Sequence, residues 1–136
     1  AAQRAGEGAE APVGAMTFRA AIFEGAGQAL RLAEFPVPGL AADEALVRIR
    51  CATICGSDLH TQTGRRTTPC PSVLGHEMVG EVVATGPEGL RDARGEAIPI
   101  GARVTWSVVW SCRRCAMCRR GMSAKCEALR KFGHEA

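Results

Sequence analysis

The sequence contains no tyrosine, and among its 136 residues the aromatic side chains are four Phe and two Trp. No stretch is apolar for long enough to span a bilayer. A large excess of one charge is also missing, because 17 Lys and Arg face 14 Asp and Glu and the two signs are interspersed. These absences argue against an aromatic platform for bases, a basic nucleic-acid surface and a membrane protein. We expect a core built mainly from Val, Ile, Leu and Ala.

What is present is an ordinary globular composition, with 46% hydrophobic and 23% charged residues. The length suits one compact domain or part of one. Residues 1–15 are a mixture of Ala, Gly, Glu and Pro without the apolar core of a secretory signal, which predicts a disordered leader. The domain would then occupy residues 16–136, with Met16 as a candidate natural start.

Short apolar and β-branched runs alternate with Gly, Pro and charged residues along the chain, and no long helical period occurs before residue 119. One run places Val47, Ile49 and Cys51 on a single face, which is typical of a half-buried strand. Residues 25–28 have the composition of a hairpin turn. The sequence therefore predicts a mainly β fold, a small barrel or sandwich, with strands at residues 17–24, 30–35, 45–51, 78–85 and 103–110.

Four of the seven cysteines form a Cys-x-x-Cys-x-x-Cys pattern, with a further Cys after seven intervening residues. Cysteines spaced this closely surround one metal more easily than they form unstrained disulfides, which favours a reducing, cytoplasmic location. Four thiolates would complete a closed tetrahedral zinc site of structural type; an iron–sulfur cluster and disulfides are the alternatives. The predicted ligands, in a lobe over residues 111–127, are Cys112, Cys115, Cys118 and Cys126. Their charge would be offset by the neighbouring Arg113, Arg114, Arg119, Arg120 and Lys125.

A second group of chemically capable residues is spread over two segments. Cys55 and His76 carry donor atoms that suit zinc, and Ser57, His60 and Glu77 lie close to them in the sequence. Taken singly, each has an ordinary explanation: a small buried hydrophobe, a hydrogen-bonded loop residue or a solvated charge. Residue chemistry alone therefore leaves a second metal site open.

Residues 55–60, 75–82 and 101–104, followed by the four-cysteine lobe, resemble in order and spacing the zinc-dependent alcohol dehydrogenases of the medium-chain dehydrogenase/reductase family. The resemblance covers the chain from about Phe18 to Cys126. It implies the GroES-like catalytic domain of that family, a partly open β-barrel. Ala102 and Gly89 depart from the family's pattern, which affects local loop geometry but no metal ligand.

By this resemblance, Cys55 and His76 correspond to two protein ligands of a catalytic zinc, and Glu77 to the carboxylate close to that metal. Asp58 corresponds to the acid that supports the ligating histidine. Ser57 corresponds to the hydroxyl that takes the proton of the substrate alcohol, and His60 to the relay that passes this proton towards solvent. The family's zinc acidifies the alcohol, whose carbon then transfers hydride to NAD or NADP.

Ten residues follow Cys126, too few for the family's Rossmann domain, so the resemblance implies an N-terminal fragment that is inactive alone. The full-length enzyme would oxidise an alcohol or reduce an aldehyde or ketone, as a homo-oligomer. A finer similarity, carried by residues 55–61, 64–66, 103–107 and 131–135, is to a subgroup associated with phosphonate catabolism. The repeated dipeptide at His134 and Glu135 is expected to have a structural or surface role.

Two other interpretations stand beside this one. An independent zinc module could bind a protein or nucleic acid through the basic lobe, but it would leave Cys55, Ser57, His60 and His76 unexplained. A zinc-free relative of the quinone reductases could share the fold. That group generally lacks both sets of zinc ligands, which are present in this sequence.

Overall fold

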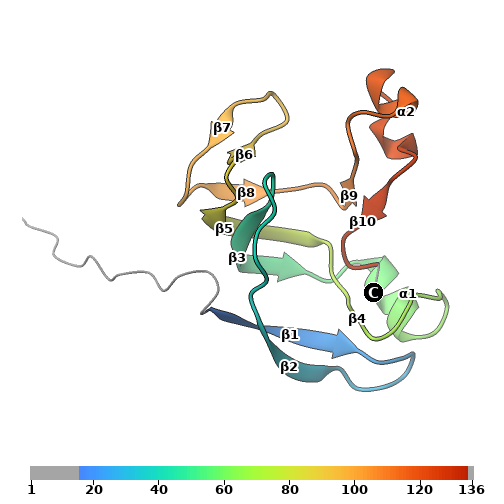
Figure 1. Ribbon diagram of the computed structural model, residues 1–136. Coiled ribbons are helices and arrows are strands. Elements are labelled where there is room, and N and C mark those ends of the chain that lie inside the picture. Colours follow the sequence, from blue (N-terminus) through green and yellow to red (C-terminus); the bar gives the residue numbers. More distant parts are fainter. Residues whose placement is uncertain (1–15, 135–136) are drawn as a thin grey trace, which may run out of the picture.

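The computed structural model describes residues 16–134, so the leader predicted over residues 1–15 and the expectation for Glu135 lie outside the described part. The described chain is mainly β, as predicted. It forms two three-stranded antiparallel sheets, with strand orders β2-β1-β4 and β3-β5-β8, and two ribbons of two strands each (Figure 1). None of the described helices is long and apolar enough to cross a membrane.

The first sheet is the predicted N-terminal hairpin with a short third strand. Its strands pair in continuous register from Thr17 opposite Pro36 to Ile22 opposite Arg31. The turn between them needs glycine at Gly27, whose φ of +74° lies in the left-handed region. The bounds are β1 (Thr17–Phe23), β2 (Arg31–Pro36) and β4 (Ser72–Val73).

The second sheet positions the candidate site, because one of its long strands ends beside it and the other begins there. Its strands are β3 (Ala45–Thr53), β5 (Glu77–Thr85) and β8 (Arg103–Thr105). The first two leave no room for a side chain at Gly80, where an added Cβ would lie 2.4 Å from Val47 Cγ1 and 2.8 Å from the Arg48 carbonyl oxygen. Glycine is therefore required at this point of the sheet.

The half-buried face predicted for β3 is wrong in its outer part. Val47 is partly buried, but Ile49 is 47% exposed and Cys51 is exposed. The register between β3 and β5 shifts twice, between residues 46 and 47 and between residues 49 and 51. Such irregularities disturb the strict alternation of side chains on which the prediction depended.

The single strand predicted over residues 103–110 is also wrong, because the chain changes partner within it. β8 ends at Thr105, whose hydroxyl donates to the Met78 carbonyl oxygen at 2.9 Å. The chain then leaves the sheet and forms a ribbon from β9 (Val109–Trp110) and β10 (Arg130–Lys131). The four-cysteine lobe is the tip of this ribbon (Figure 1) and contains α2 (Ala116–Arg119) and a 3-10 helix (Ser123–Lys125).

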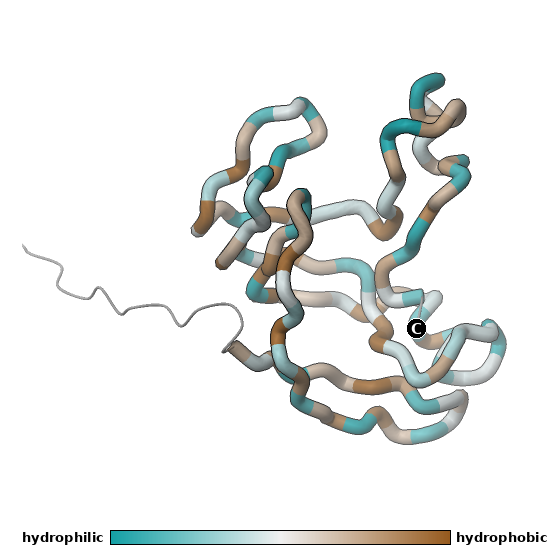
Figure 2. The backbone as a smooth tube through the Cα atoms, in the orientation of Figure 1, coloured by the Kyte–Doolittle hydropathy of each residue, from teal (hydrophilic) through white to brown (hydrophobic). Residues whose placement is uncertain are grey.

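The long connection after β5 carries a small ribbon of β6 (Leu90–Arg91) and β7 (Ala97–Ile98), and a short helix, α1 (Gly56–Gln62), follows β3. The fully buried Val82 of β5 and the buried Ile22 and Phe23 of β1 belong to a small core. Hydrophobic residues recur along the strands of both three-stranded sheets (Figure 2). The helix and both ends of the lobe lie to one side of this core.

Candidate functional site

The N-terminus of helix α1 is capped by a cysteine side chain. Cys55 is its N-cap, and the Cys55 Sγ accepts the backbone N–H of Ser57 at 3.3 Å. Asp58 completes a capping box, because its Oδ2 accepts the backbone N–H of Cys55 at 3.0 Å. The other oxygen of Asp58 accepts the backbone N–H of Gly75 at 3.2 Å. The buried carboxylate therefore joins the segment that carries Cys55 to the segment that carries His76.

The structure brings together three of the predicted metal ligands. Ligand atoms of Cys55, His76 and Glu77 all lie within 4.8 Å of one another. The Cys55 Sγ is 3.2 Å from His76 Nε2, and Glu77 is held by the Thr53 hydroxyl, which donates to Glu77 Oε2 at 2.7 Å. A thiolate, an imidazole and a carboxylate fit a catalytic zinc with three protein ligands and one open position.

Ser57 lies inside this cluster, whereas His60 lies outside it. The Ser57 Oγ is 2.9 Å from the Cys55 Sγ and 3.4 Å from His76 Nε2. His60 is on the same helix, one turn later, with an exposed side chain. Among the hydrogen bonds of the described residues, none joins the Ser57 hydroxyl to the His60 ring. Their roles in proton transfer stay predictions.

The predicted support of His76 by Asp58 is not a direct hydrogen bond. His76 Nδ1 and Asp58 Oδ1 are 3.7 Å apart, which is beyond hydrogen-bonding distance. Both side chains are only 9% exposed, so this separation lies in the interior. His76 Nδ1 is buried and has no hydrogen-bond partner among the described residues.

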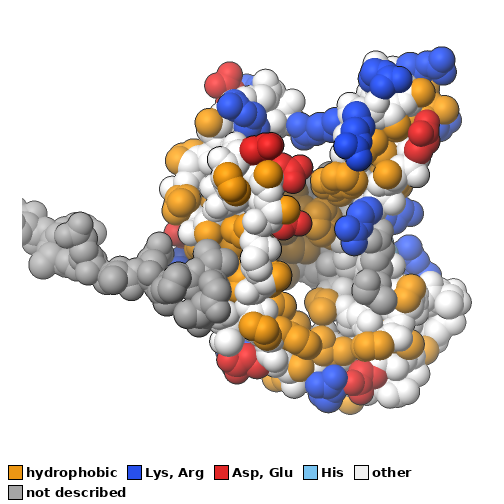
Figure 3. Space-filling view, in the orientation of Figure 1, with side chains coloured by type: hydrophobic (Ala, Val, Ile, Leu, Met, Phe, Trp, Pro, Cys, Tyr) orange, Lys and Arg blue, Asp and Glu red, His pale blue; other side chains and the backbone are white. Residues whose placement is uncertain are grey.

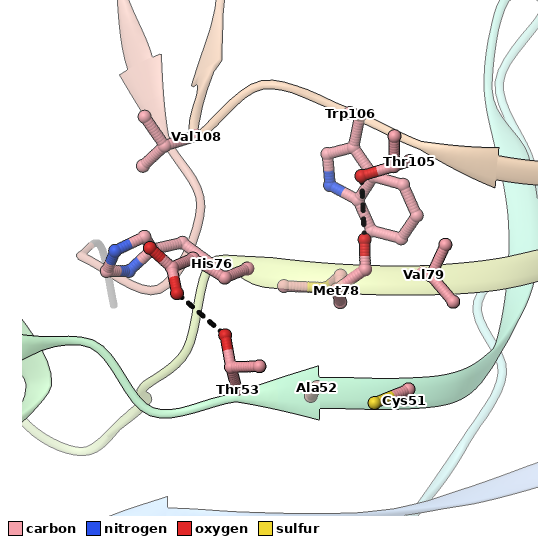
Figure 4. Close-up of a pocket in the computed structure, with 10 residues that line it drawn as sticks. Cys51, Ala52, Thr53, His76, Met78, Val79, Thr105, Trp106 and Val108 are labelled. Atoms are coloured by element: carbon pink, nitrogen blue, oxygen red, sulfur yellow. Dashed lines mark hydrogen bonds between the residues drawn. The ribbon is translucent and has the colours of Figure 1, made fainter.

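An open cavity of about 600 Å³ extends from this cluster along β3 and β5. Figure 4 shows His76 and Thr53 at one end of it and Cys51 and Val79 further along the strands. Trp106 and Val108, from the segment between β8 and β9, face the cavity from the other side. The walls beyond the cluster are largely apolar, which suits the carbon skeleton of a small organic molecule.

His134 is the site residue whose position the sequence did not predict. Its ring lies against that of His76, with 4.7 Å between centroids and 44° between planes. Burial lowers the pKa of His134 from its ordinary value, so the ring is held in the neutral form. Of the two roles expected for this residue, structural or surface, the ring contact favours the structural one. Its position in the sequence, after the lobe, gives no sign of this contact. The contact forms because β10 and the turn after it carry the chain back to the site.

The four cysteines of the lobe lie within 4.8 Å of one another through their sulfur atoms, as a zinc site requires. All seven cysteines are free thiols, and the Cys112 and Cys126 sulfurs are 3.5 Å apart, far beyond a disulfide bond of about 2.05 Å. Tetrahedral ligands at about 2.3 Å from zinc would be roughly 3.8 Å apart. Backbone N–H groups of Cys112, Cys115, Cys118 and Ala128 donate to these sulfurs at 3.3–3.4 Å.

The electrostatics of the lobe also suit a cation. The backbone N–H of Glu127 lowers the pKa of the Cys115 thiol to about 6, whereas burial raises the pKa of Cys118 to about 12. Without a metal the four sulfurs could not all be ionised near neutral pH, whereas a bound zinc keeps its thiols deprotonated. Arginine and lysine side chains gather on the lobe (Figure 3), beside the negative charge that four thiolates would bring.

Comparisons with known proteins identify the fold. Residues 41–134 match the alcohol dehydrogenase GroES-like domain. A zinc-binding dehydrogenase from Sinorhizobium meliloti, solved with NADP bound, is 33% identical with a TM-score of 0.70, over 89% of this chain and 33% of that one. An alcohol dehydrogenase from Thermotoga maritima is 29% identical with a TM-score of 0.78, over the same shares of the two chains.

The L-threonine 3-dehydrogenase of Edwardsiella ictaluri is 37% identical over 105 residues, which are 74% of this chain and 29% of that protein. The chain thus spans about a third or less of the length of the proteins that it matches. The matches nevertheless include β3, β5, the cluster around Cys55 and His76, and the cysteine lobe.

Proposed function

The chain belongs to the family of zinc-dependent, medium-chain alcohol dehydrogenases through its GroES-like domain, and we propose that it is the zinc-binding catalytic domain of such an enzyme. The full enzyme would oxidise a small alcohol, or reduce the corresponding carbonyl compound, with NAD or NADP as hydride carrier. The observation that carries the proposal is the cluster of Cys55, His76 and Glu77 at the end of an open apolar cavity.

The cluster would hold the catalytic zinc, which supplies a positive charge that lowers the pKa of an alcohol hydroxyl. The Cys55 Sγ and His76 Nε2 are already 3.2 Å apart, so these two ligands would need little rearrangement to bind the metal. Glu77 would be the third donor, with the Thr53 hydroxyl bound to one of its oxygens. The apolar walls of the cavity would hold the alcohol's carbon skeleton and exclude water around the carbon that gives up hydride.

Ser57 would receive the alcohol proton, because its hydroxyl lies within the cluster, at 3.4 Å from His76 Nε2. His60 would pass the proton on to solvent, since its ring is exposed one helical turn further along α1. Because no hydrogen bond of the described residues joins the two side chains, a water molecule would bridge them. Such a proton path is a general acid–base step whose loss costs typically about 10²–10⁴-fold in rate.

The second zinc would be held by the four cysteines and would have a structural role. Its four positions would all be filled by sulfur, so no position is open for a substrate. The lobe buries little besides Cys126, so metal binding would supply much of its folding free energy.

The proposal is tested by changing single cysteines in the full-length enzyme that contains this domain. Cys55→Ser should abolish alcohol oxidation and lower the zinc content from two ions per chain to one. Cys70→Ser is the matched control, because Cys70 is exposed and belongs to neither cluster. Zinc content is measured by elemental analysis and turnover by nicotinamide absorbance. Full turnover in the Cys55 variant would refute the assignment.

A further inference from the structure

The turn after β10 packs against the segment that carries His76 through two contacts. The first is the ring contact between His134 and His76. The second is between backbones: a Cβ added at Gly133 would lie 2.3 Å from the Gly75 carbonyl oxygen, and Gly133 has a φ of +69°. Glycine is therefore needed at Gly133 both for its backbone conformation and for the close approach to Gly75.

His76 lacks the support that a metal-binding histidine normally has. Such a histidine usually donates the N–H of its free nitrogen to a carboxylate or carbonyl, which fixes the ring orientation. In this structure His76 Nδ1 is 3.7 Å from Asp58 and has no hydrogen-bond partner among residues 16–134. Both oxygens of Asp58 are occupied by the backbone N–H groups of Cys55 and Gly75. No hydrogen bond at Nδ1 within the described residues fixes the orientation of the ring, whose other nitrogen faces the cluster.

His134 is placed to do this by packing. Its ring covers that of His76 at a distance typical of aromatic pairs. It does not belong to the set of ligand atoms that lie within 4.8 Å of one another, so it is not positioned as a fourth ligand. Its Nδ1 is buried without a hydrogen-bond partner in the described part of the chain, so this nitrogen makes no polar contact that would explain why a histidine is there.

We propose that His134 is a positioning residue, whose ring packs against His76 and holds the His76 imidazole in its metal-binding orientation. The inference rests on the proposed function, because it assumes that the cluster of Cys55, His76 and Glu77 binds a metal. It places in the site a residue that no zinc-ligand pattern includes. Loss of the ring should weaken metal binding at this cluster and leave the four-cysteine site unaffected.

The test measures cobalt(II) binding to the chain by absorption spectroscopy, since cobalt reports both affinity and coordination geometry. The signals of the two sites are separated with a Cys55→Ser chain, which retains the four-cysteine signal alone. His134→Ala should weaken cobalt binding at the cluster by about tenfold or more, as removal of a supporting residue typically does. His134→Phe should restore the affinity to within about twofold, because it keeps the ring and removes the unpaired nitrogen. Ile100→Ala, which removes an exposed side chain that belongs to neither cluster, should leave the affinity unchanged.

Three outcomes would overturn the proposal. Unchanged affinity in His134→Ala would show that the ring contact does not position His76. Weak binding in both the Ala and the Phe variants would mean that a nitrogen atom, not the packing of the ring, is needed. A cobalt spectrum of lower coordination number in His134→Ala would make His134 a ligand. If the unchanged chain gave no Cys55-dependent cobalt signal, the metal site itself, and with it the proposed function, would be wrong.

Discussion

Replacing Asp58 with alanine should cost more free energy of unfolding than any loss of a surface charge on this domain. The Asp58 side chain is 9% exposed, and its carboxylate accepts backbone N–H groups of Cys55 and Gly75, at 3.0 and 3.2 Å. A hydrogen bond to a charged group contributes about 1.5–3 kcal/mol net. Two such bonds would give about 3–6 kcal/mol, and because the amides are only partly buried we expect about 3 kcal/mol.

The matched control is Asp92→Ala. One Asp92 oxygen also accepts two backbone N–H groups, those of Arg94 and Glu96, at 2.8 and 2.9 Å. These bonds lie at the surface, where water can replace the lost carboxylate, so we expect a cost of about 1 kcal/mol or less. The comparison therefore separates the burial of Asp58, and its position between two segments, from the number of its hydrogen bonds.

Both variants are compared with the unchanged chain by urea denaturation, followed by tryptophan fluorescence. The zinc concentration must be the same throughout, because a metal that binds the folded state raises the apparent stability. Equal costs for the two substitutions would refute the reasoning. In that case the backbone N–H groups of Cys55 and Gly75 would bind other acceptors in the variant. The Asp58 carboxylate would then not be needed to hold the two segments together.

Three further predictions concern the lobe and the sheets. Cys126→Ser should release the structural zinc and destabilise the lobe, as measured by zinc content and proteolysis; a variant that retains its zinc would contradict the four-sulfur site. Val82→Ala, at a fully buried position, should lower the free energy of unfolding by about 1.5–3 kcal/mol, whereas Val73→Ala, at a 46% exposed position, should lower it by less than about 1; equal losses would count against Val82 as a core residue. Gly80→Ala should lower the thermal midpoint because its Cβ has no room, whereas Gly39→Ala, with open space around it, should not.

The parts of the fold that follow local patterns could be predicted from the sequence. The N-terminal hairpin and its glycine-containing turn depend on neighbouring residues, and the structure confirms them. The strand predicted over residues 103–110 failed because its pattern does not reveal a change of partner. Its first part pairs with β5 and its last part with β10, which lies some twenty residues further along. The exposed face of β3 failed because register shifts leave no clear mark in the sequence.

In the candidate site, too, the features that local sequence patterns carry could be predicted, whereas those that depend on long-range packing could not. Cys55, His76 and Glu77 carry recognisable donor atoms in a recognisable order, so the sequence could predict them together. Helix α1 was not predicted, although Cys55 and Asp58 have the spacing of a capping box, because cysteine is not a usual N-cap residue. The contact of His134 with His76 could not be predicted, since it depends on how the ribbon beyond the lobe returns to the site.

The ribbon of β9 and β10 has a consequence for how the site is assembled. Its two short strands can pair only if the ends of the intervening chain, from Ser111 to Leu129, come together, and closing such a loop reduces the entropy of the chain. Metal bonds at Cys112 and Cys126 would tie those ends together before the strands pair, since the two residues flank the loop. Beyond β10, Gly133 and His134 would then spend more of their time against Gly75 and His76. An ion with no part in the chemistry would in this way stabilise the assembled reactive site.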